Sequence, residues 1–228
     1  MIKILYKISL YGNIFRYWIK NHFNPINKYE NIVFLEEYFK DKKKGFYVDV
    51  GCFHPIRLSN TMFLHSKGWK GMNIDSSKKS IDLFKIARPK DINLNFGVGS
   101  KNETLDYFYN KKAFANNTFN IDFAKNFLKK NEIKKDTIEV KTLKFIMENY
   151  STEKKIDLLD IDAEGFDLNV LKGMDFERYV IDLIMIEVHN YDDKTKKISD
   201  EILNFLTKKN FKLVFGIYPG NCIFKKSI

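Results

Sequence analysis

Acidic residues stand at the ends of two early apolar segments of this 228-residue chain. The first segment, 46–50, contains Asp49 and is followed by Gly51, and the second, 72–74, is followed by Asp75. Glycine at the end of a strand lets a ligand approach the backbone, and an acid about 20 residues further along accepts hydrogen bonds from a ribose. These residues therefore predict half of a site for a nucleotide-containing cofactor.

Carboxylates and one histidine follow two later apolar segments. Alternation along a strand places Asp160 and Asp162 on the same side, and the turn after the strand can bring Glu164 toward them. Glu187 and His189 stand at the end of another apolar segment. Such a group can take a proton, with histidine the base best suited to neutral pH, or bind Mg²⁺ through its oxygen atoms. A lone histidine after a strand is often only structural, so both chemistries stay open.

Apolar segments alternate with helical patterns, which predicts an α/β fold with a mostly parallel sheet and helices on both faces. Strands are expected at 46–50, 72–74, 92–98, 105–109, 138–140, 156–161 and 180–188, and a closing hairpin at 211–215 and 222–224. Helices are expected at 59–67, 78–88, 121–130, 142–148, 168–171 and 198–208, and a polar loop at 113–120. Ser59 is expected to cap the first helix, whereas capping leaves Asn60 unexplained and free to face a pocket. The segment from 105 to 130 is an insertion that could act as a lid.

Composition limits the class of protein. With 44% apolar and 15% aromatic residues, the chain can build a single core. The formal charge of +10 comes from scattered lysines, which indicates either a solvated surface or attraction to an acidic partner such as a sugar nucleotide, an anionic glycan or a lipid headgroup. No basic block or RNA-binding motif accompanies the charge, so a nucleic-acid partner is not expected. Cys52 and Cys222 are far apart and favour neither a disulfide nor zinc, which fits the cytoplasm.

The first twenty residues mix apolar and basic side chains. Basic residues interrupt every apolar run: Lys3, Lys7, Arg16 and Lys20. Neither a signal peptide nor a spanning helix is therefore expected. Apolar residues nevertheless recur at helical spacing, which predicts either a helix packed on the domain or a basic amphipathic segment at the inner membrane surface. We expect residues 1–44 to form a helical extension packed on a domain at 45–228.

Five segments, in order, carry a family resemblance: VDVGCFHPIRLSNTMFLHSKGWKGMNID, FKIARPKDINLNFGVGS, VKTLKFI, IDLLDIDAEGFDLNVLKG and IMIEVHN. Over residues 45–190 the chain resembles the FkbM family of S-adenosylmethionine-dependent methyltransferases. The resemblance implies a Rossmann-like class I methyltransferase with a mostly parallel seven-stranded sheet, helices on both faces and a C-terminal antiparallel hairpin. It also implies O-methylation of a hydroxyl on a sugar, a glycan or a related secondary metabolite.

The resemblance also implies which residues hold the cofactor, a molecule that needs carboxylates, close backbone approach and apolar walls. The expected cofactor-binding residues are Asp49, Gly51, Asn60, Asp75, Ser76, Asn95, Gly97 and Asp162. Asp49 and Gly51 match the turn beneath the amino-acid tail, and Asp75 matches the acid that holds the ribose. Asn95 and Gly97 either flank the adenine or only shape a loop. Ser76 stands where the family more often has proline, and two glycines of the general pattern are replaced.

Catalysis is expected at the second group of acids. Asp162 matches the polar residue beside the transferring methyl group, and the base is sought among Asp162, Glu164, Glu187 and His189. Mg²⁺ that orients a sugar diol is an open alternative. A different class also stays open, namely a non-catalytic Rossmann-like nucleotide-binding or scaffold protein, or a nucleotide-sugar-modifying enzyme. Acids at successive strand ends disfavour a scaffold, because stability alone does not require them, and the missing glycine fingerprint disfavours a dehydrogenase.

Overall fold

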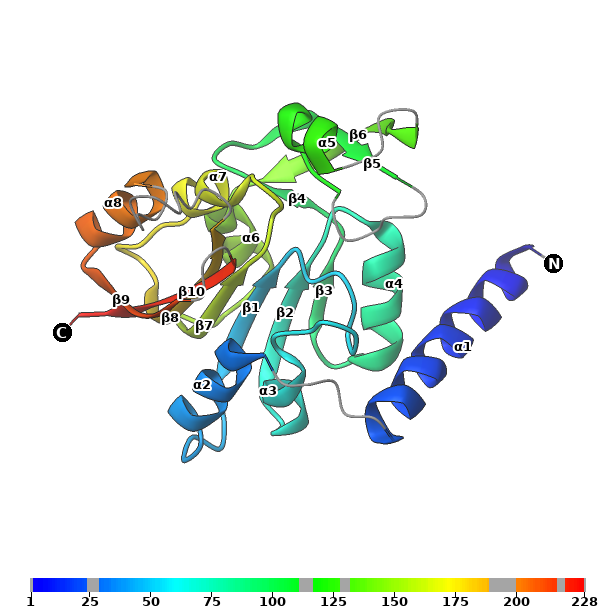
Figure 1. Ribbon diagram of the computed structural model, residues 1–228, viewed down its shortest axis with the longest axis horizontal. Coiled ribbons are helices and arrows are strands. Elements are labelled where there is room, and N and C mark those ends of the chain that lie inside the picture. Colours follow the sequence, from blue (N-terminus) through cyan, green and yellow to red (C-terminus); the bar gives the residue numbers. More distant parts are fainter. Residues whose placement is uncertain are drawn as a thin grey trace.

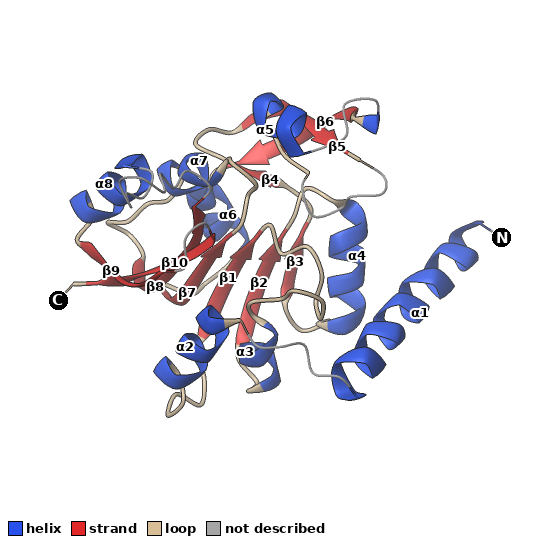
Figure 2. Ribbon diagram, in the orientation of Figure 1, coloured by secondary structure: helices blue, strands red, loops and turns tan. Residues whose placement is uncertain are grey.

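The computed structural model describes residues 2–23, 29–110, 117–127, 132–188, 200–216 and 220–227. A seven-stranded sheet forms its centre, with the strand order β3-β2-β1-β7-β8-β10-β9 (Figures 1 and 2). Its strands are β1 (Phe46–Val50), β2 (Lys70–Ile74), β3 (Ile92–Leu94), β7 (Lys155–Ile161), β8 (Val180–Val188), β9 (Phe211–Gly216) and β10 (Gly220–Lys226). All neighbours from β3 to β8 pair in parallel, and β10 runs antiparallel to both β8 and β9. The predicted fold class, including the closing hairpin, is confirmed.

Most of the helices lie on the two faces of this sheet, whereas the first packs on another helix and the fifth on a strand outside the sheet. The helices are α1 (Ile2–Phe23), α2 (Glu30–Tyr38), α3 (Met62–Ser66), α4 (Lys78–Ala87), α5 (Ile121–Phe127), α6 (Leu143–Tyr150), α7 (Asp167–Lys172) and α8 (Asp200–Lys208). Successive side chains of a strand point to opposite faces. Val48 accordingly packs in the core cluster that contains residues of α6, α7 and α8, and Tyr47 packs in the cluster with Leu35 of α2 and Leu64 of α3. Helix α2 therefore packs on the sheet. The division into an extension at 1–44 and a domain at 45–228 stays a prediction.

The strand expected at 92–98 is two strands, and that expectation was wrong. Only β3 lies in the main sheet, whereas β4 (Gly97–Val98) belongs to a second sheet of order β4-β6-β5, with β5 (Glu103–Tyr109) and β6 (Lys134–Lys141). Between the two strands, the Asn95 side-chain amide donates hydrogen bonds to the backbone carbonyls of Asp75 and Ser76, both at 2.9 Å. These bonds turn the chain across the end of β2, so that it leaves the main sheet. The strand expected at 138–140 is present as β6, which is longer than expected.

The cap expected at Ser59 was also wrong, because α3 begins at Met62 with Thr61 as its N-cap residue. Both hydroxyls bind a buried guanidinium instead. Arg88 donates from Nη2 to Ser59 Oγ and from Nη1 to Thr61 Oγ1, each at 2.9 Å, and Thr61 Oγ1 in turn donates to Asp49 Oδ2 at 2.6 Å. The segment 59–61 is therefore held by the end of α4.

Arg88 is only 1% exposed, and the hydrogen bonds of its guanidinium reach residues distant in the sequence. Its Nη2 also donates to the Pro55 carbonyl at 2.7 Å, and its Nη1 donates to the Tyr47 hydroxyl at 3.0 Å. The ring of Phe84 lies 4.8 Å from the guanidinium carbon. Arg88 thus fixes the loop after β1 on the strand that precedes it.

Gly51 shows how closely the turns after β1 and β7 pass. Its φ is +78°, and a Cβ there would stand 1.8 Å from the Asp162 carbonyl oxygen. Gly68 has a similar φ of +82°, but nothing lies within 4 Å of its Cβ position. The two glycines therefore share a backbone conformation and differ only in their surroundings.

We expect Gly68→Ala to lower the free energy of unfolding by about 1 kcal/mol, the cost of left-handed backbone for an L-residue. Gly51→Ala should cost about 3 kcal/mol or more, because the clash with Asp162 adds to the same backbone term. Urea unfolding of both variants measures the difference. Equal losses would show that the turns are not in contact.

We expect Arg88→Lys to lower the free energy of unfolding by about 3 kcal/mol, although the charge is kept, because lysine cannot reproduce the planar set of donors and leaves buried oxygens unsatisfied. Arg178, which is exposed and paired with Glu148, provides the control. Arg178→Lys should change stability by less than about 1 kcal/mol. A comparable effect of the two substitutions in urea titrations would remove the structural role assigned to Arg88.

Candidate functional site

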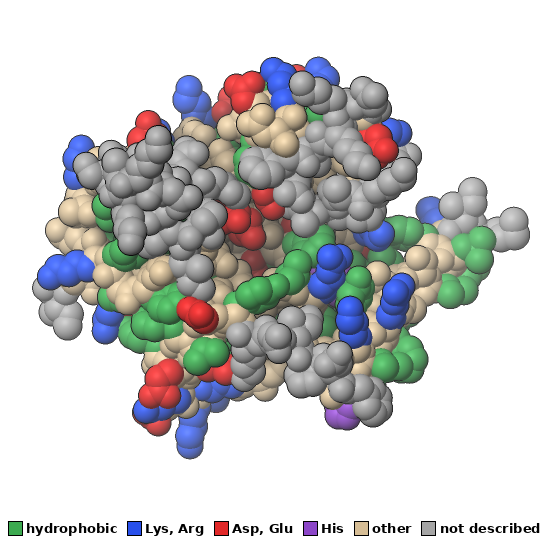
Figure 3. Space-filling model, viewed as in Figure 1, with side chains coloured by type: hydrophobic (Ala, Val, Ile, Leu, Met, Phe, Trp, Pro, Cys, Tyr) green, Lys and Arg blue, Asp and Glu red, His purple; other side chains and the backbone are tan. Residues whose placement is uncertain are grey.

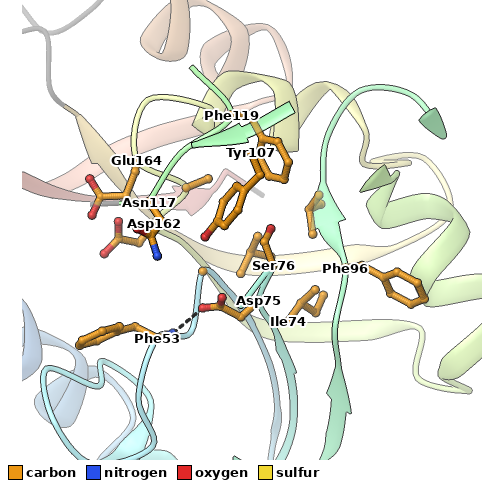
Figure 4. A pocket seen from close by; sticks show the side chains of 14 residues that line it. Phe53, Ile74, Asp75, Ser76, Phe96, Tyr107, Asn117, Phe119, Asp162 and Glu164 are labelled. Carbon is orange, nitrogen blue, oxygen red and sulfur yellow. Dashed lines mark hydrogen bonds between the residues drawn. The ribbon is translucent and has the colours of Figure 1, made fainter. Parts of the chain in front are cut away.

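Two adjoining cavities open at the carboxyl ends of β1, β2 and β7. In the space-filling view, acidic side chains line a hollow on the face shown (Figure 3). The first cavity has apolar walls and a few polar groups (Figure 4); residues that line it include Ile74, Asp75, Ser76, Phe96, Tyr107 and Phe119. The second cavity is strongly acidic; residues that line it include Asp49, Leu58, Ser59, Asn60 and Asp160.

Four residues line both cavities: Gly51, Phe53, Asp162 and Glu164. They come from the turns after β1 and β7, which the Val50 carbonyl joins by accepting a hydrogen bond from the Asp162 backbone N–H at 3.0 Å. Glu164 occupies a left-handed conformation with φ of +51°, and its carbonyl accepts a hydrogen bond from the Thr118 hydroxyl at 2.7 Å. A ligand in one cavity would therefore meet a ligand in the other at these two acids.

Asp75 is fixed at the base of the first cavity. Its Oδ2 accepts a hydrogen bond from the Phe53 backbone N–H at 2.9 Å (Figure 4), and its Oδ1 accepts one from the Ser77 N–H at 2.6 Å. Burial raises the pKa of Asp75 to about 6, even though these two bonds act in the opposite direction. A hydroxyl-bearing or cationic ligand would stabilise its charged form.

Three carboxylates converge beside the junction. One oxygen each of Asp162, Glu164 and Glu187 lies within 4.8 Å of the others. Burial raises the pKa of Asp162 well above its usual value, and the neighbouring Glu187 and Glu164 raise it further. Asp160, two residues earlier along β7, is 3% exposed. Burial raises its pKa well above the usual value, and the negative charge of Asp49 raises it further. The chemistry available here is proton transfer or the binding of a cation.

The structure brings together most of the residues that the sequence singled out. Asp75, Ser76, Gly51 and Asp162 line the first cavity, whereas Asp49 and Asn60 line the second. Burial raises the pKa of Asp49 to about 6, and the hydrogen bond from Thr61 and the charge of Arg88 oppose that rise. His189 lies outside the described residues.

Asn95 and Gly97 line neither cavity. The Asn95 amide is used to turn the backbone after β3, as described above. A Cβ at Gly97 would stand 2.5 Å from the Phe119 ring and 2.8 Å from Val140 Cγ2, so glycine is required there by packing. Both residues thus have a structural role, at the turn after β3 and in the packing of β4, and their contact with the cofactor stays a prediction.

The sequence did not predict that aromatic residues of the insertion belong to the site. Tyr107 of β5 and Phe119 line the first cavity with their ring centroids 4.9 Å apart, and Asn117 lies beside them (Figure 4). Burial raises the pKa of Tyr107 well above its usual value, so its hydroxyl stays protonated. The sequence signal was the aromatic and asparagine-rich character of the insertion, but nothing local to it says which cavity it covers.

Comparison with known proteins places the chain in a family. The model of the methyltransferase FkbM domain matches residues 49–213, which is well over half of the chain. Similar solved structures include a TehB-like SAM-dependent methyltransferase from Corynebacterium glutamicum, with 12% identity, a TM-score of 0.46 and coverage of 95% of this chain and 97% of that one. Another is a SAM-dependent methyltransferase from Methanosarcina mazei, with 11% identity, a TM-score of 0.43 and coverage of 89% and 100%.

Among curated proteins, none matches this chain. The family match extends from Asp49 on β1 to Leu213 on β9, and it includes the strand ends that form both cavities. The chain therefore belongs to the FkbM family of S-adenosylmethionine-dependent methyltransferases.

Proposed function

We propose that the protein transfers the methyl group of S-adenosylmethionine to a hydroxyl oxygen of a sugar, a glycan or a related small molecule. The observation that carries this proposal is the junction of the two cavities at Asp162 and Glu164. A methyl donor in the first cavity and an acceptor in the second would meet there. Methyl transfer needs such an arrangement, because the acceptor oxygen must be held in line with the methyl carbon.

The first cavity fits the parts of the donor. Asp75 would accept hydrogen bonds from the ribose hydroxyls, and the bare backbone at Gly51 leaves room for the amino-acid tail. Ile74, Phe96 and Tyr107 provide apolar walls for the adenine. When bound, the donor supplies an electrophilic methyl group on a sulfonium, and the acids at the junction favour that positive charge.

The second cavity fits a hydroxylated acceptor, since carboxylates, Ser59 and Asn60 offer hydrogen bonds to several hydroxyls. As the acceptor oxygen bonds to the methyl carbon and the sulfur–carbon bond breaks, the hydroxyl proton passes to a carboxylate. We assign this base to Asp162, which lines both cavities and whose pKa is raised well above its usual value by burial, so that it is a stronger proton acceptor than an ordinary carboxylate. Glu187 would raise the proton affinity of Asp162, and Glu164 would orient the acceptor.

Mg²⁺ is the alternative use of the same three carboxylates, because oxygen ligands of this kind suit that ion. In the proposed mechanism, transfer needs no metal, since the base lies beside the junction. Chelation separates the two cases in the activity assay described below.

We expect Asp75→Asn to weaken the affinity for S-adenosylmethionine by about 10- to 100-fold, because the ribose loses a charged acceptor whose hydrogen bonds are worth about 1.5–3 kcal/mol. Isothermal titration calorimetry measures this, with NAD as the control ligand, which should not bind. Asp106→Asn, on the exposed side of β5, is the matched control and should leave affinity unchanged. Failure of the unaltered protein to bind S-adenosylmethionine would overturn the proposed function.

We expect Asp162→Asn to lower kcat by about 10²- to 10⁴-fold, the usual contribution of a positioned base. Glu187→Gln should instead move the acidic limb of the pH–rate profile to lower pH, because Asp162 loses the neighbour that raises its pKa. The assay follows the gain of one labelled methyl group by candidate glycans and nucleotide sugars in mass spectrometry. The exposed Glu139→Gln provides the control, and EDTA should have no effect.

Three results would contradict parts of this assignment. Binding of the donor without methylation of any hydroxylated acceptor would favour the non-catalytic alternative. Loss of activity with EDTA, restored by Mg²⁺, would assign the carboxylates to a metal instead. An unchanged pH profile in Glu187→Gln would remove the coupling between Glu187 and Asp162.

A further inference from the structure

Helix α1 has two apolar faces, and only one of them meets the rest of the protein. The inner face packs against α4 and the loop after β1 (Figure 1). On it, Leu10 is 4% exposed, the Tyr6 hydroxyl donates to Asp82 Oδ2 at 3.0 Å, and the Tyr17 ring meets the His54 ring edge-on at 4.9 Å between centroids. These residues are spaced at i, i+4 and i+11, which follows one side of a helix.

His54 strengthens this inner contact. Its Nδ1 accepts hydrogen bonds from the backbone N–H groups of Ile56 and Arg57, so its Nε2 is the donor to Asn13 Oδ1 at 2.8 Å. Burial lowers the pKa of His54 to about 4, and the charge of Arg57 lowers it further. The neutral ring therefore holds α1 on the domain near neutral pH.

The outer face of α1 carries a second apolar stripe that faces solvent. The stripe consists of Ile4, Leu5, Ile8, Tyr11, Phe15 and Trp18. Each of these side chains is between 54% and 64% exposed. Hydrophobic and basic side chains are visible along this helix at the right of Figure 3. An exposed contiguous stripe of this kind marks an interaction surface, since the inner face alone secures the helix to the domain.

Charge identifies the partner. Residues 2–23 contain no aspartate or glutamate, and on a helical projection their basic residues fall on both flanks of the stripe: Lys3, Lys7, Arg16 and Lys20. An apolar stripe rich in aromatic residues with basic flanks fits the boundary between anionic headgroups and acyl chains. Two copies of α1 joined along their stripes would bring these cations together with no acid in the helix to neutralise them. Charge complementarity thus favours a lipid surface over a second copy of the chain.

We propose that α1 lies in the plane of an anionic membrane, with the stripe in the headgroup region, and anchors the protein peripherally. Among the helices that the structure describes, none has the length and apolar character that crossing a bilayer requires. The anchor is connected to the site, because the Arg57 guanidinium lies 5.9 Å from the Tyr17 ring of α1 and 5.6 Å from the Phe53 ring, which lines both cavities. The proposal does not depend on the methyl-transfer reaction, and its test uses no activity.

Co-sedimentation of the full chain with vesicles tests this proposal. Vesicles of phosphatidylcholine with phosphatidylserine should bind the protein, and vesicles of phosphatidylcholine alone should bind it weakly, with binding to the former falling as salt is added. Ile8→Ser/Phe15→Ser and, separately, Lys7→Glu/Lys20→Glu should each weaken binding by about tenfold or more.

Matched controls change the same kinds of residue elsewhere. Val33→Ser/Val180→Ser removes two exposed apolar side chains outside α1, and Lys208→Glu/Lys212→Glu reverses two exposed charges on α8 and β9; both should bind as the unaltered chain does. Circular dichroism checks that all variants are folded. Absence of binding to anionic vesicles, or equal binding by all variants, would overturn the proposal. Sedimentation equilibrium showing dimers that the stripe variant loses would overturn it in favour of a second copy.

Discussion

The arrangement of the site depends on the buried guanidinium of Arg88. A buried charge costs several kcal/mol unless its hydrogen bonds are satisfied, and Arg88 satisfies them with oxygens from β1, the loop after it and the start of α3. Those oxygens belong to segments that line the second cavity. The hydrogen bonds that offset the cost of burying the Arg88 charge therefore also shape that cavity. The Arg88 charge in addition offsets part of the burial cost of Asp49.

Acids dominate the opposite side of this arrangement. Asp49, Asp75, Asp160 and Asp162 are withdrawn from water at the carboxyl ends of parallel strands, and burial raises the pKa of each. Arg88 lies behind Asp49 and lines neither cavity. A site built in this way binds a cationic ligand favourably, because the ligand supplies the positive charge that the acids lack. The sulfonium of the family's methyl donor is a cation of this kind.

Helix α1 has the features of both structures expected for the N-terminal segment. Its inner face packs on α4, as expected of a helix docked on the domain, and its outer face keeps the apolar stripe and basic flanks expected of an amphipathic segment. One helix accommodates both patterns because its circumference offers more than one stripe at a spacing of three and four residues. The docking side is chosen by Tyr6, Leu10 and Tyr17, which find partners on α4 and beside His54.

The sequence by itself determined the parallel sheet, the closing hairpin and the acids at strand ends. Continuous apolar runs such as β1 must be buried on both faces, and the residue that follows such a run must emerge at the sheet's edge. Local patterns of this kind can be recognised in the sequence without knowing which distant segments they contact. They were enough to place Asp75 and Asp162 beside one cavity.

Tertiary structure decided what depends on contacts between distant segments. The Ser59 hydroxyl, expected to cap a helix, instead accepts a hydrogen bond from Arg88, because a hydrogen bond from a charged guanidinium is stronger than one from a backbone N–H. The strand expected at 92–98 divided where Asn95 found the carbonyls at the end of β2. Tyr107 and Phe119 became walls of the first cavity only because β5 pairs with β6 and the second sheet borders that cavity. Side chains so far apart in sequence carry no local sign of one another, and only the folded chain sets their distances.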